Sequence, residues 1–418
     1  MEIKRKIAAA VTAGTLLFSS FAQVAFAGTT IEISGNGTNS DNDATITTTN
    51  TTTVVQDNNA NITNKVDVDA DTGHNDANDN TGGDVSIKTG DVDSEVTVSN
   101  TLNVNSANVD CCPVGDTEVT ISGNGSNSDN TATLDQTNKT EVYQDNNAYV
   151  YNNVKANGNT GENDAEDNTG GSVTIETGDV DTKVSVSTSG NVNSAQVGDG
   201  SGEGSSVSVW ITDNGTNSDN DVDLDLSNTT SVVQDNNANI KNKVDVDADT
   251  GHNDANDNTG GDVLIDTGDV DTEVTVDNMV NFNVADVDCL CLLSDILAKI
   301  SGNGSDSDNT IKAELDETLE VFQGNCDDDE GWYGKCATEN NVDVDGDTGE
   351  NDAEDNTGEP EGDPSVETGD VDTTVDLENS GNVNLYGDED LGSDFDFDFD
   401  LDISLDLSDL LDALLDLV

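Results

Sequence analysis

Basic side chains are scarce in this chain of 418 residues, which has 13 lysines and arginines against 88 aspartates and glutamates and a formal net charge of −75. Nucleic-acid binding is excluded, because contacts to phosphates need clustered Lys and Arg. The same shortage excludes binding to an anionic membrane surface. The excess of carboxylates instead suits small cations, above all calcium, and keeps the chain soluble when no cation is bound.

Apolar residues are also few, with 32% hydrophobic and 4% aromatic residues. The length would allow about three ordinary domains, but this apolar supply is too thin to fill three globular cores. Low hydrophobicity combined with a high net charge is also typical of disordered chains. No stretch of 18 or more apolar residues follows residue 27, so the sequence predicts no transmembrane span in the mature chain.

The segment 1–27 has the features of a secretory signal peptide. It has a basic start at residues 4–6, an apolar run from Ile7, and an Ala-Phe-Ala cleavage motif at 25–27. The alternative is an N-terminal membrane anchor, against which the polar interruptions and the cleavage motif argue. The sequence therefore predicts a secreted, extracellular chain that begins near Gly28. It carries no Leu-Pro-x-Thr-Gly sorting motif, so we expect any attachment to the cell surface to be non-covalent.

The six cysteines suit an oxidising compartment. Cys326 and Cys336 bracket the loop CDDDEGWYGKC, and we predict that they close it as a disulfide. The other four lie at equivalent places in two of the repeats described below: Cys111, Cys112, Cys289 and Cys291. Zinc is the competing interpretation, but no histidine accompanies these pairs and their spacing is not CxxC. Their pairing stays open, and cross-links between subunits are among the alternatives.

One sequence unit occurs four times along the chain. The motif SGNGTNSDN at Ser34 returns with small changes at Ser122, Thr212 and Ser301, in steps of 88, 90 and 89 residues. The predicted organisation is a signal peptide, four repeats and a C-terminal segment, with the bounds 1–27, 28–116, 117–205, 206–295, 296–388 and 389–418.

Copies one and three are the most similar pair. They carry the two histidines of the chain, His74 and His252, where copies two and four have Glu162 and Glu350. The array is therefore a doubled two-repeat unit, a history of duplication typical of elongated surface proteins.

Within each repeat, apolar and polar residues alternate. In the first copy seven apolar residues fall on even numbers, and this period of two predicts strands. They are Ala44, Ile46, Val54, Ala60, Ile62, Val66 and Val68. QDNN, which begins at Gln56 between two such runs, is a turn by composition. Further strands are predicted around the TGDVD motif at Thr89. No stretch inside the repeats shows a helical period, so the repeats are predicted to be all-β.

Each copy has too few large aliphatic side chains for a free-standing sandwich, which favours stacking copy on copy so that apolar faces are shared. The predicted fold is therefore all-β: four tandem repeats of about 89 residues stacked into an elongated β-solenoid-like rod. Inward Asn and Thr would form stacked ladders between layers. A string of separate β-sandwich domains is the alternative, favoured by the unbroken alternation.

The best candidate for chemistry is the acidic loop before the TGDV motif, which in copy one has the sequence VDVDADTGHNDANDNTGGD (66–84). Its first three aspartates alternate with inward valines and share the outer face. Thr72 and Gly73 are expected to turn the chain so that the later Asn and Asp residues come back toward them. In copy two, Lys, Asn and Asn replace the three aspartates.

Calcium prefers six to eight oxygen ligands from carboxylates and carbonyls, which such a loop supplies. Calcium is therefore the predicted cofactor. The predicted ligands are Asp67, Asp69, Asp71, Asn75, Asp76, Asp79, Asp164, Asp167, Asp245, Asp247, Asp249, Asp254, Asp257, Asp343, Asp345, Asp347, Asp352 and Asp355. The alternative is that the first aspartates are only the solvated side of an amphipathic strand. His74 and His252 are predicted to be exposed loop residues rather than ligands.

The D-x-D-x-D start of these loops resembles the opening of EF-hand and thrombospondin-type calcium loops. The resemblance covers six or seven residues per copy. It departs from the EF-hand pattern, because the glycine comes one place late and no glutamate follows at the twelfth position. The resemblance therefore implies calcium binding but not the EF-hand fold.

The last thirty residues differ in character from the repeats. From Phe395 the sequence FDFDFDLDISLDL alternates apolar and acidic residues, which predicts an amphipathic strand, and Ser408 is placed to cap a short helix. The residues predicted to mediate assembly are Phe395, Phe397, Phe399, Leu401 and Ile403. The segment is either a lid over the open end of the stack or a strand donated to a neighbouring subunit.

Catalysis has little support, because no nucleophile motif or phosphate loop is present and the carboxylates are too numerous to single out an acid–base pair. The sequence predicts a non-enzymatic, secreted structural or cell-surface protein, stabilised by calcium, whose partners are itself or other surface proteins. One alternative is an adhesin that binds an external ligand through Trp332 and Tyr333. Another is an acidic protein that buffers ions or templates a mineral.

The motif NTGG-x-V-x-I-x-TGDV, followed by alternating valines and Asn-x-Asn, covers most of each copy. It resembles uncharacterised secreted repeat proteins of candidate-phylum bacteria. That resemblance implies export and repetition, and it brings no established activity.

Overall fold

The computed structural model describes residues 20–22, 28–109, 116–198, 206–288, 295–326, 336–358 and 364–387. Most of the predicted signal peptide, the other four cysteines, Trp332 with Tyr333, and the C-terminal segment 389–418 lie outside these residues. The short helix, and the role of the C-terminal segment as a lid or a donated strand, therefore stay predictions. Within the described residues no helix is long and apolar enough to span a lipid bilayer.

Each repeat forms one layer of strands, which we call a rung. Rung 1 contains β2 (Thr29–Ser34), β3 (Asp41–Asp71), β4 (Val85–Lys88), β5 (Val92–Thr101) and β6 (Val104–Val109). Rung 2 contains β7 (Thr117–Ser122), β8 (Asp129–Asn159), β9 (Val173–Glu176) and β10 (Val180–Val197). Rung 3 contains β11 (Ser206–Thr212), β12 (Asp219–Asp249), β13 (Val263–Asp266) and β14 (Val270–Val287). Rung 4 contains β15 (Asp295–Ser301), β16 (Asp308–Asn325), β17 (Thr338–Asp347), β18 (Ser365–Glu367) and β19 (Val371–Tyr386).

Equivalent strands of successive rungs pair in parallel and in register, so that each residue lies beside its counterpart in the next repeat. Four sheets result. The long sheet holds β3, β8, β12 and β16 with β17, and the return sheet holds β5 with β6, β10, β14 and β19. Two short sheets hold β2, β7, β11 and β15, and β4, β9, β13 and β18. The predicted all-β, solenoid-like stack of four repeats is confirmed, and it replaces the alternative of separate sandwiches.

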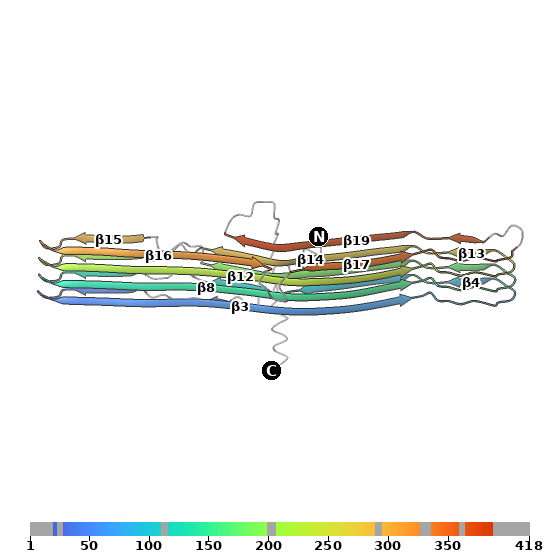
Figure 1. Ribbon diagram of the computed structural model, residues 1–418, viewed down its shortest axis with the longest axis horizontal. Helices are drawn as coiled ribbons and strands as arrows, with labels where there is room; N and C mark the ends of the chain where they lie inside the picture. The colour runs from blue at the N-terminus through green and yellow to red at the C-terminus, as the bar shows by residue number, and fades with distance from the viewer. Residues whose placement is uncertain are drawn as a thin grey trace, which may run out of the picture.

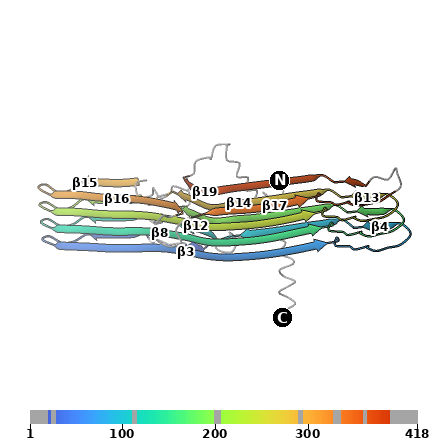
Figure 2. The same cartoon turned by 45° about the vertical axis from the view of Figure 1, so that its right-hand side comes forward.

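The long dimension of the molecule runs along the strands (Figure 1). β3 alone has 31 residues, or about 100 Å at about 3.3 Å per residue. The four rungs, by contrast, stack over only about 14 Å, because neighbouring strands lie about 4.8 Å apart. Figure 2 shows the same four layers from a turned view. The chain is thus elongated by the length of its rungs and not by their number.

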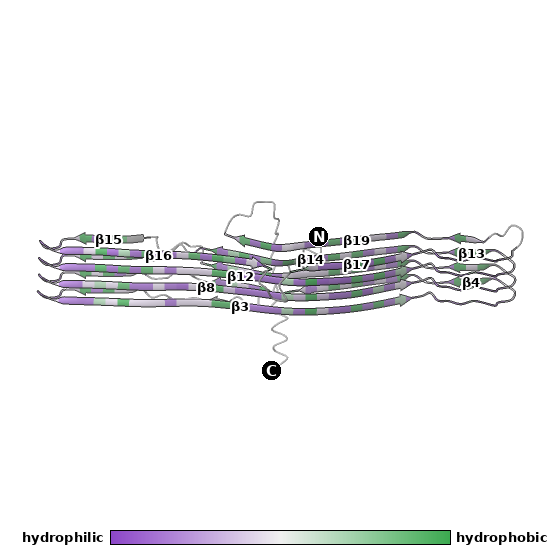
Figure 3. Cartoon of the chain, in the orientation of Figure 1, coloured by the Kyte–Doolittle hydropathy of each residue, from purple (hydrophilic) through white to green (hydrophobic). Residues whose placement is uncertain are grey.

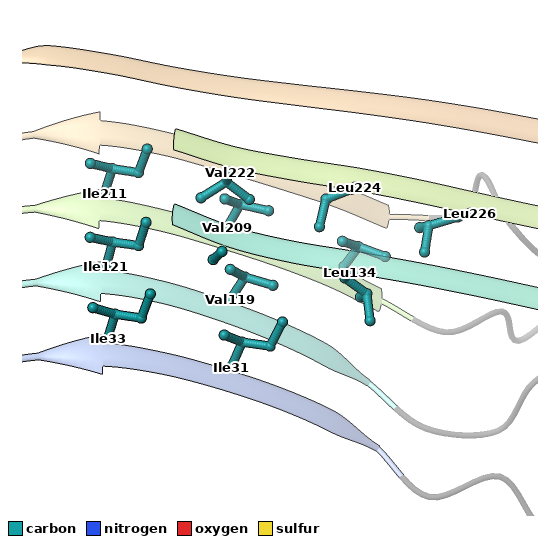
Figure 4. Packing of buried hydrophobic residues seen from close by; sticks show 12 residues of the cluster. Ile31, Ile33, Val119, Ile121, Leu134, Val209, Ile211, Val222, Leu224 and Leu226 are labelled. Carbon is teal, nitrogen blue, oxygen red and sulfur yellow. The ribbon is translucent and has the colours of Figure 1, made fainter. Parts of the chain in front are cut away.

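The core lies between the long sheet and the sheets opposite it. More buried and less buried residues alternate along the long strands β8 and β12, and apolar stripes recur along them in Figure 3. Inward side chains stack on their counterparts, so that one apolar cluster continues through the rungs (Figure 4). Its members include Ile31, Ile33, Val119, Ile121, Leu134, Val209, Ile211 and Leu224. Burial of each such side chain contributes about 1.5–3 kcal/mol, and most of the core is shared between repeats.

The predicted turn at QDNN is wrong, because Gln56 to Asn59 lie inside the continuous strand β3. Gln56 and Asn58 point inward, and their amides are bonded to the next rung and to β6 of their own rung. Gln144 Nε2 donates to Gln56 Oε1 at 2.7 Å, and Gln56 Nε2 donates to the backbone oxygen of Ser106 at 2.8 Å. Because the amides of successive rungs are hydrogen-bonded to one another, Gln and Asn can lie buried inside a strand and need not be at a turn.

The predicted Cys326–Cys336 disulfide is confirmed, with its Cα atoms 5.2 Å apart. It closes an insertion in rung 4 between β16 and β17. Asn236 pairs with Asn325 and Ile240 with Thr338, so twelve residues (326–337) replace three (237–239) in that rung. Because the two cysteines hold the ends of the insertion close together, β17 continues in line with β16.

Candidate metal centre

The acidic loops stack as closely as the strands do. The backbone N–H of His74 donates to Gly161 O at 3.0 Å, and that of Ala77 donates to Asp164 O at 2.8 Å. The glycine after each Thr makes this approach possible, since a Cβ at Gly161 would lie 2.0 Å from Gly251 O. The loops of neighbouring repeats are therefore held at the strand spacing of about 4.8 Å.

Asparagine amides run through the same loops as continuous columns. Asn75 Nδ2 donates to Asn163 Oδ1 at 2.8 Å, and Asn163 Nδ2 donates to Asn253 Oδ1 at 2.8 Å. Asn75 Nδ2 also donates to Thr72 O at 2.9 Å. Asn75 was predicted as a metal ligand, and the structure gives its amide a place in the column that holds the loops together.

Each predicted aspartate lies in a column that crosses the rungs. Five columns follow from the register of the long sheet, the bridges between the loops and the repeat spacing. They are Asp67–Lys155–Asp245–Asp343, Asp69–Asn157–Asp247–Asp345, Asp71–Asn159–Asp249–Asp347, Asp76–Asp164–Asp254–Asp352 and Asp79–Asp167–Asp257–Asp355. In the first three columns the second repeat interrupts the row of carboxylates with Lys or Asn. In the last two columns every position is Asp.

Carboxyl groups of neighbouring rungs lie close together in the loops. The start of a loop, at Asp71, and its later part, at the column of Asp254, have different partners. Asp71 accepts from the N–H of Gly73 at 2.8 Å and bonds His74 at 3.0 Å. The column through Asp254 instead lies beside Glu166. These contacts form two clusters, an outer one around the histidines and an inner one around Glu166. The fold-back of the later loop residues onto Asp71 stays a prediction.

The outer cluster contains His252 of rung 3 and carboxylates of two rungs. His252 Nδ1 lies 2.9 Å from Asp249 Oδ2, and its Nε2 lies 2.9 Å from Glu350 Oε2. In the described part of the chain, one group of three His, Cys, Asp or Glu ligand atoms lies within 4.8 Å, and it consists of His252, Asp347 and Glu350. Imidazole and carboxylate ligands together suit a first-row transition ion, whereas calcium takes oxygen ligands.

Charge in this cluster alternates from rung to rung. His74 bonds Glu162 at 2.6 Å, as His252 bonds Glu350. Burial alone would lower the pKa of His252, but the negative charges of Asp249 and Asp347 and the bond to Glu350 raise it above its usual value. Both histidines are exposed, as predicted, whereas their partners Glu162 and Glu350 were not among the predicted site residues. The alternation of His and Glu among the copies was the available signal.

The inner cluster is crowded with carboxyl groups. Burial raises the pKa of Glu166 to about 7, together with a hydrogen bond to Asp254 and the charges of Asp164, Asp254 and Asp167. Burial also raises the pKa of Asp254. Glu166 was not among the predicted site residues, and only the stacking of rung 2 on rung 3 places it beside Asp254.

Two carboxylate oxygens of the inner cluster are buried without a hydrogen-bond donor. They are Oδ1 of Asp164 and Oδ1 of Asp254, which belong to adjacent rungs and to the same column. A buried, unpaired carboxylate oxygen is costly, and a cation is the partner that would satisfy both at once. The donor set of this column, oxygen throughout, fits a hard cation such as calcium.

No protein-family model matches the chain, and neither a curated protein nor a solved structure is similar to it.

Proposed function

We propose that this chain is a secreted structural protein of the cell surface, without catalytic activity, that assembles with itself and is stabilised by calcium. The observation that carries the calcium assignment is the Asp76–Asp164–Asp254–Asp352 column, in which Asp164 and Asp254 each bury an unpaired oxygen. Stacking four copies in register forces these like charges together, and a divalent ion removes that repulsion locally.

The second support is the charge of the whole chain. A net charge of −75 opposes a compact state through self-repulsion, while the stacked columns confine many of these charges to a few rows. Ions bound only in the folded state stabilise it by mass action, by about 2.7 kcal/mol per site at a hundredfold excess over the dissociation constant.

Thermal unfolding with calcium and with chelator tests the calcium assignment. We expect calcium to raise the melting temperature of the wild-type protein, and calorimetry to show saturable binding. In the double variant D164N/D254N the calcium-dependent rise should shrink, while the metal-free protein should melt at a higher temperature because repulsion is relieved.

The matched control is D181N/D271N. It removes the same charge from the same two rungs, in a column that is Asp in all four repeats but solvent-exposed. It should retain the full calcium-dependent rise. An unchanged melting temperature of the wild-type protein on adding calcium would refute the assignment.

A further inference from the structure

The two sheets of the stack are offset by part of a rung. β10 of rung 2 contacts β8 of its own rung and β12 of the next, and β14 contacts β12 and also β16 and β17. β5 likewise contacts β3 and β8. Each return strand thus lies between two long strands, so the ends of the stack are steps. At the rung 1 end, which we call the head, β3 is outermost, and at the rung 4 end, the tail, β19 is outermost (Figures 1 and 2).

The step at the tail exposes apolar side chains that the inner rungs bury. Val371, Val375 and Leu377 of β19 are 46%, 44% and 46% exposed, whereas their rung 3 counterparts Val270, Val274 and Val276 are at most 1% exposed. The step at the head also leaves apolar side chains incompletely covered. The inward valines of β3, which include Val66 and Val68, are only partly buried, since no return strand covers their outer side.

The amide columns give the stack a direction. Asn64 Nδ2 donates to Asn152 Oδ1, Asn152 Nδ2 to Asn242 Oδ1, and Asn242 Nδ2 to Asn340 Oδ1. The inward column that starts at Asn42 runs the same way. In these Asn columns the head therefore presents amide oxygens and the tail presents amide N–H groups. The Gln column has the opposite polarity, because Gln144 donates to Gln56 and Gln323 donates to Gln234. A head placed on a tail continues these columns, while two heads would oppose oxygen to oxygen.

Return-strand amides also bridge to the next rung where there is one. Asn193 Nδ2 donates to Gln144 O at 3.3 Å in its own rung and to Asp235 O at 2.9 Å in the next. Its counterpart Asn384 donates to Gln323 O at 3.1 Å in rung 4, and the stack ends there. A further rung 1 would supply the second acceptor.

Charges at the two ends are complementary in the continued register. The column Lys88–Glu176–Asp266–Glu367 would place Glu367 against Lys88 of a second copy. Glu350 would likewise be followed by a histidine, His74, as Glu162 is followed by His252 in the alternating column. Lys299 at the tail would meet Glu32 at the head by the register of β2, β7, β11 and β15.

Gly90 at the head has no structural need to be glycine within one molecule. A Cβ at Gly178 would lie 2.5 Å from the carbonyl carbon and oxygen of Gly90 in the preceding rung, so glycine is required there. A Cβ at Gly90 would meet nothing within 4 Å, and Gly90 does not have a positive φ. A preceding rung from another molecule, with Gly369 opposite Gly90, would restore the requirement.

We propose that rung 1 of one molecule stacks on rung 4 of another in the register of the internal rungs, and that repetition of this joint builds an open-ended fibre. Such a head-to-tail contact does not close on itself, and unpaired strand edges are templates for further strands. The proposal rests on the self-assembly in the proposed function and names its interface.

β1 (Ser20–Ala22) shows that the head can accept a further parallel strand. It pairs in parallel with the outer edge of β6, with Ser20 opposite Ala107. β1 belongs to the predicted signal peptide, so removal of that peptide vacates this part of the head.

Electron microscopy and sedimentation of the chain from Gly28 onward test the joint, in calcium and in chelator. We expect the wild-type protein to form fibres about as thick as one rung is long. G90A should remain a monomer with an unchanged melting temperature, because its added methyl group clashes only with a second copy. E367K should also remain a monomer, because the introduced lysine would face Lys88 of the next copy while gaining Asp266 within its own.

E378K is the matched control for the charge change. It makes the same substitution on the same rung, but the continued register places it opposite Ser99, so it should form fibres. An equimolar mixture of G90A and E367K should yield a single dimer, since the first keeps a free tail and the second a free head.

Wild-type protein that stays monomeric in both solutions, or G90A that forms fibres as readily as wild type, would overturn the joint. The outcome is separable from that of the calcium test. Calcium-dependent stabilisation without fibres would leave the calcium assignment standing and remove the joint. Fibres in chelator without any calcium-dependent stabilisation would do the opposite.

Discussion

Gly178 and Gly90 share the motif Thr-Gly-Asp and differ only in their place in the stack. Gly178 lies against the backbone of Gly90, whereas Gly90 faces open space. We predict that G178A lowers the free energy of unfolding by about 1–3 kcal/mol, because the backbones of two rungs must separate to admit the methyl group. G90A should leave it unchanged within about 0.5 kcal/mol. Urea unfolding of both variants in dilute, unassembled protein measures the difference, and equal losses would contradict the close approach.

Asp277 gives a pH dependence that does not involve the metal columns. Burial raises its pKa above the usual 3.8, and the charges of Glu378 and Asp376 add to the rise. The folded state therefore holds this proton more tightly than the unfolded chain. Stability from this group is greatest below its unfolded pKa and falls as the pH rises through the folded pKa.

We predict that D277N flattens this part of the pH profile and raises the melting temperature near neutral pH. Thermal melts from pH 3 to 8 measure the effect. D271N, on the same strand but exposed, should leave the acidic limb of the profile as in the wild type. A D277N profile parallel to the wild-type one would show that Asp277 is not the group responsible.

Strands of this length were only partly predictable from the alternating pattern. The period of two from Ala44 to Val68 correctly predicted which residues point inward. It did not extend to Gln56 and Asn58, because the composition of QDNN is typical of a turn. In the structure each of these amides is hydrogen-bonded to the equivalent residue of the next repeat, 88 or 90 residues away, and the pattern within one repeat does not show this.

Amide columns should make strong contributions to the stability of the long strands. Asn193 is buried, and its Oδ1 accepts from Asn146 Nδ2 at 2.8 Å and Asn105 Nδ2 at 3.0 Å. We predict that N193A costs about 1–3 kcal/mol for each partner left unpaired. N384A, the same column at the open tail, should cost clearly less, because water can replace the lost bonds there. Chemical unfolding compares the two, and similar losses would show that the columns act alike at buried and open positions.

Stacking of the four repeats explains which features of the candidate metal centre the sequence predicted and which it did not. The acidic loops were identified because Asp and Asn are dense there. Their grouping was not, since Asp254 meets Glu166 and His252 meets Glu350 only when separate repeats are superimposed at about 4.8 Å. Once an in-register stack is assumed, each column can be written directly from the sequence, and the alternation of His and Glu becomes a way to avoid like-charged neighbours.

The C-terminal segment 389–418 provides a test of how the stack ends. The described strands build the core from rungs 1 to 4 alone, and the proposed joint uses rung 4 directly. We therefore predict that deleting 389–418 leaves the melting temperature within a few degrees of the wild type and leaves fibre formation intact. Differential scanning calorimetry and sedimentation of the truncated chain measure both. Early melting or aggregation would instead identify the segment as a lid over an end of the stack, because a lid shields apolar edges from water. A folded but strictly monomeric truncation would identify it as a donated strand, and the fibre would then be joined by Phe395 to Ile403 and not by the edges of rungs 1 and 4.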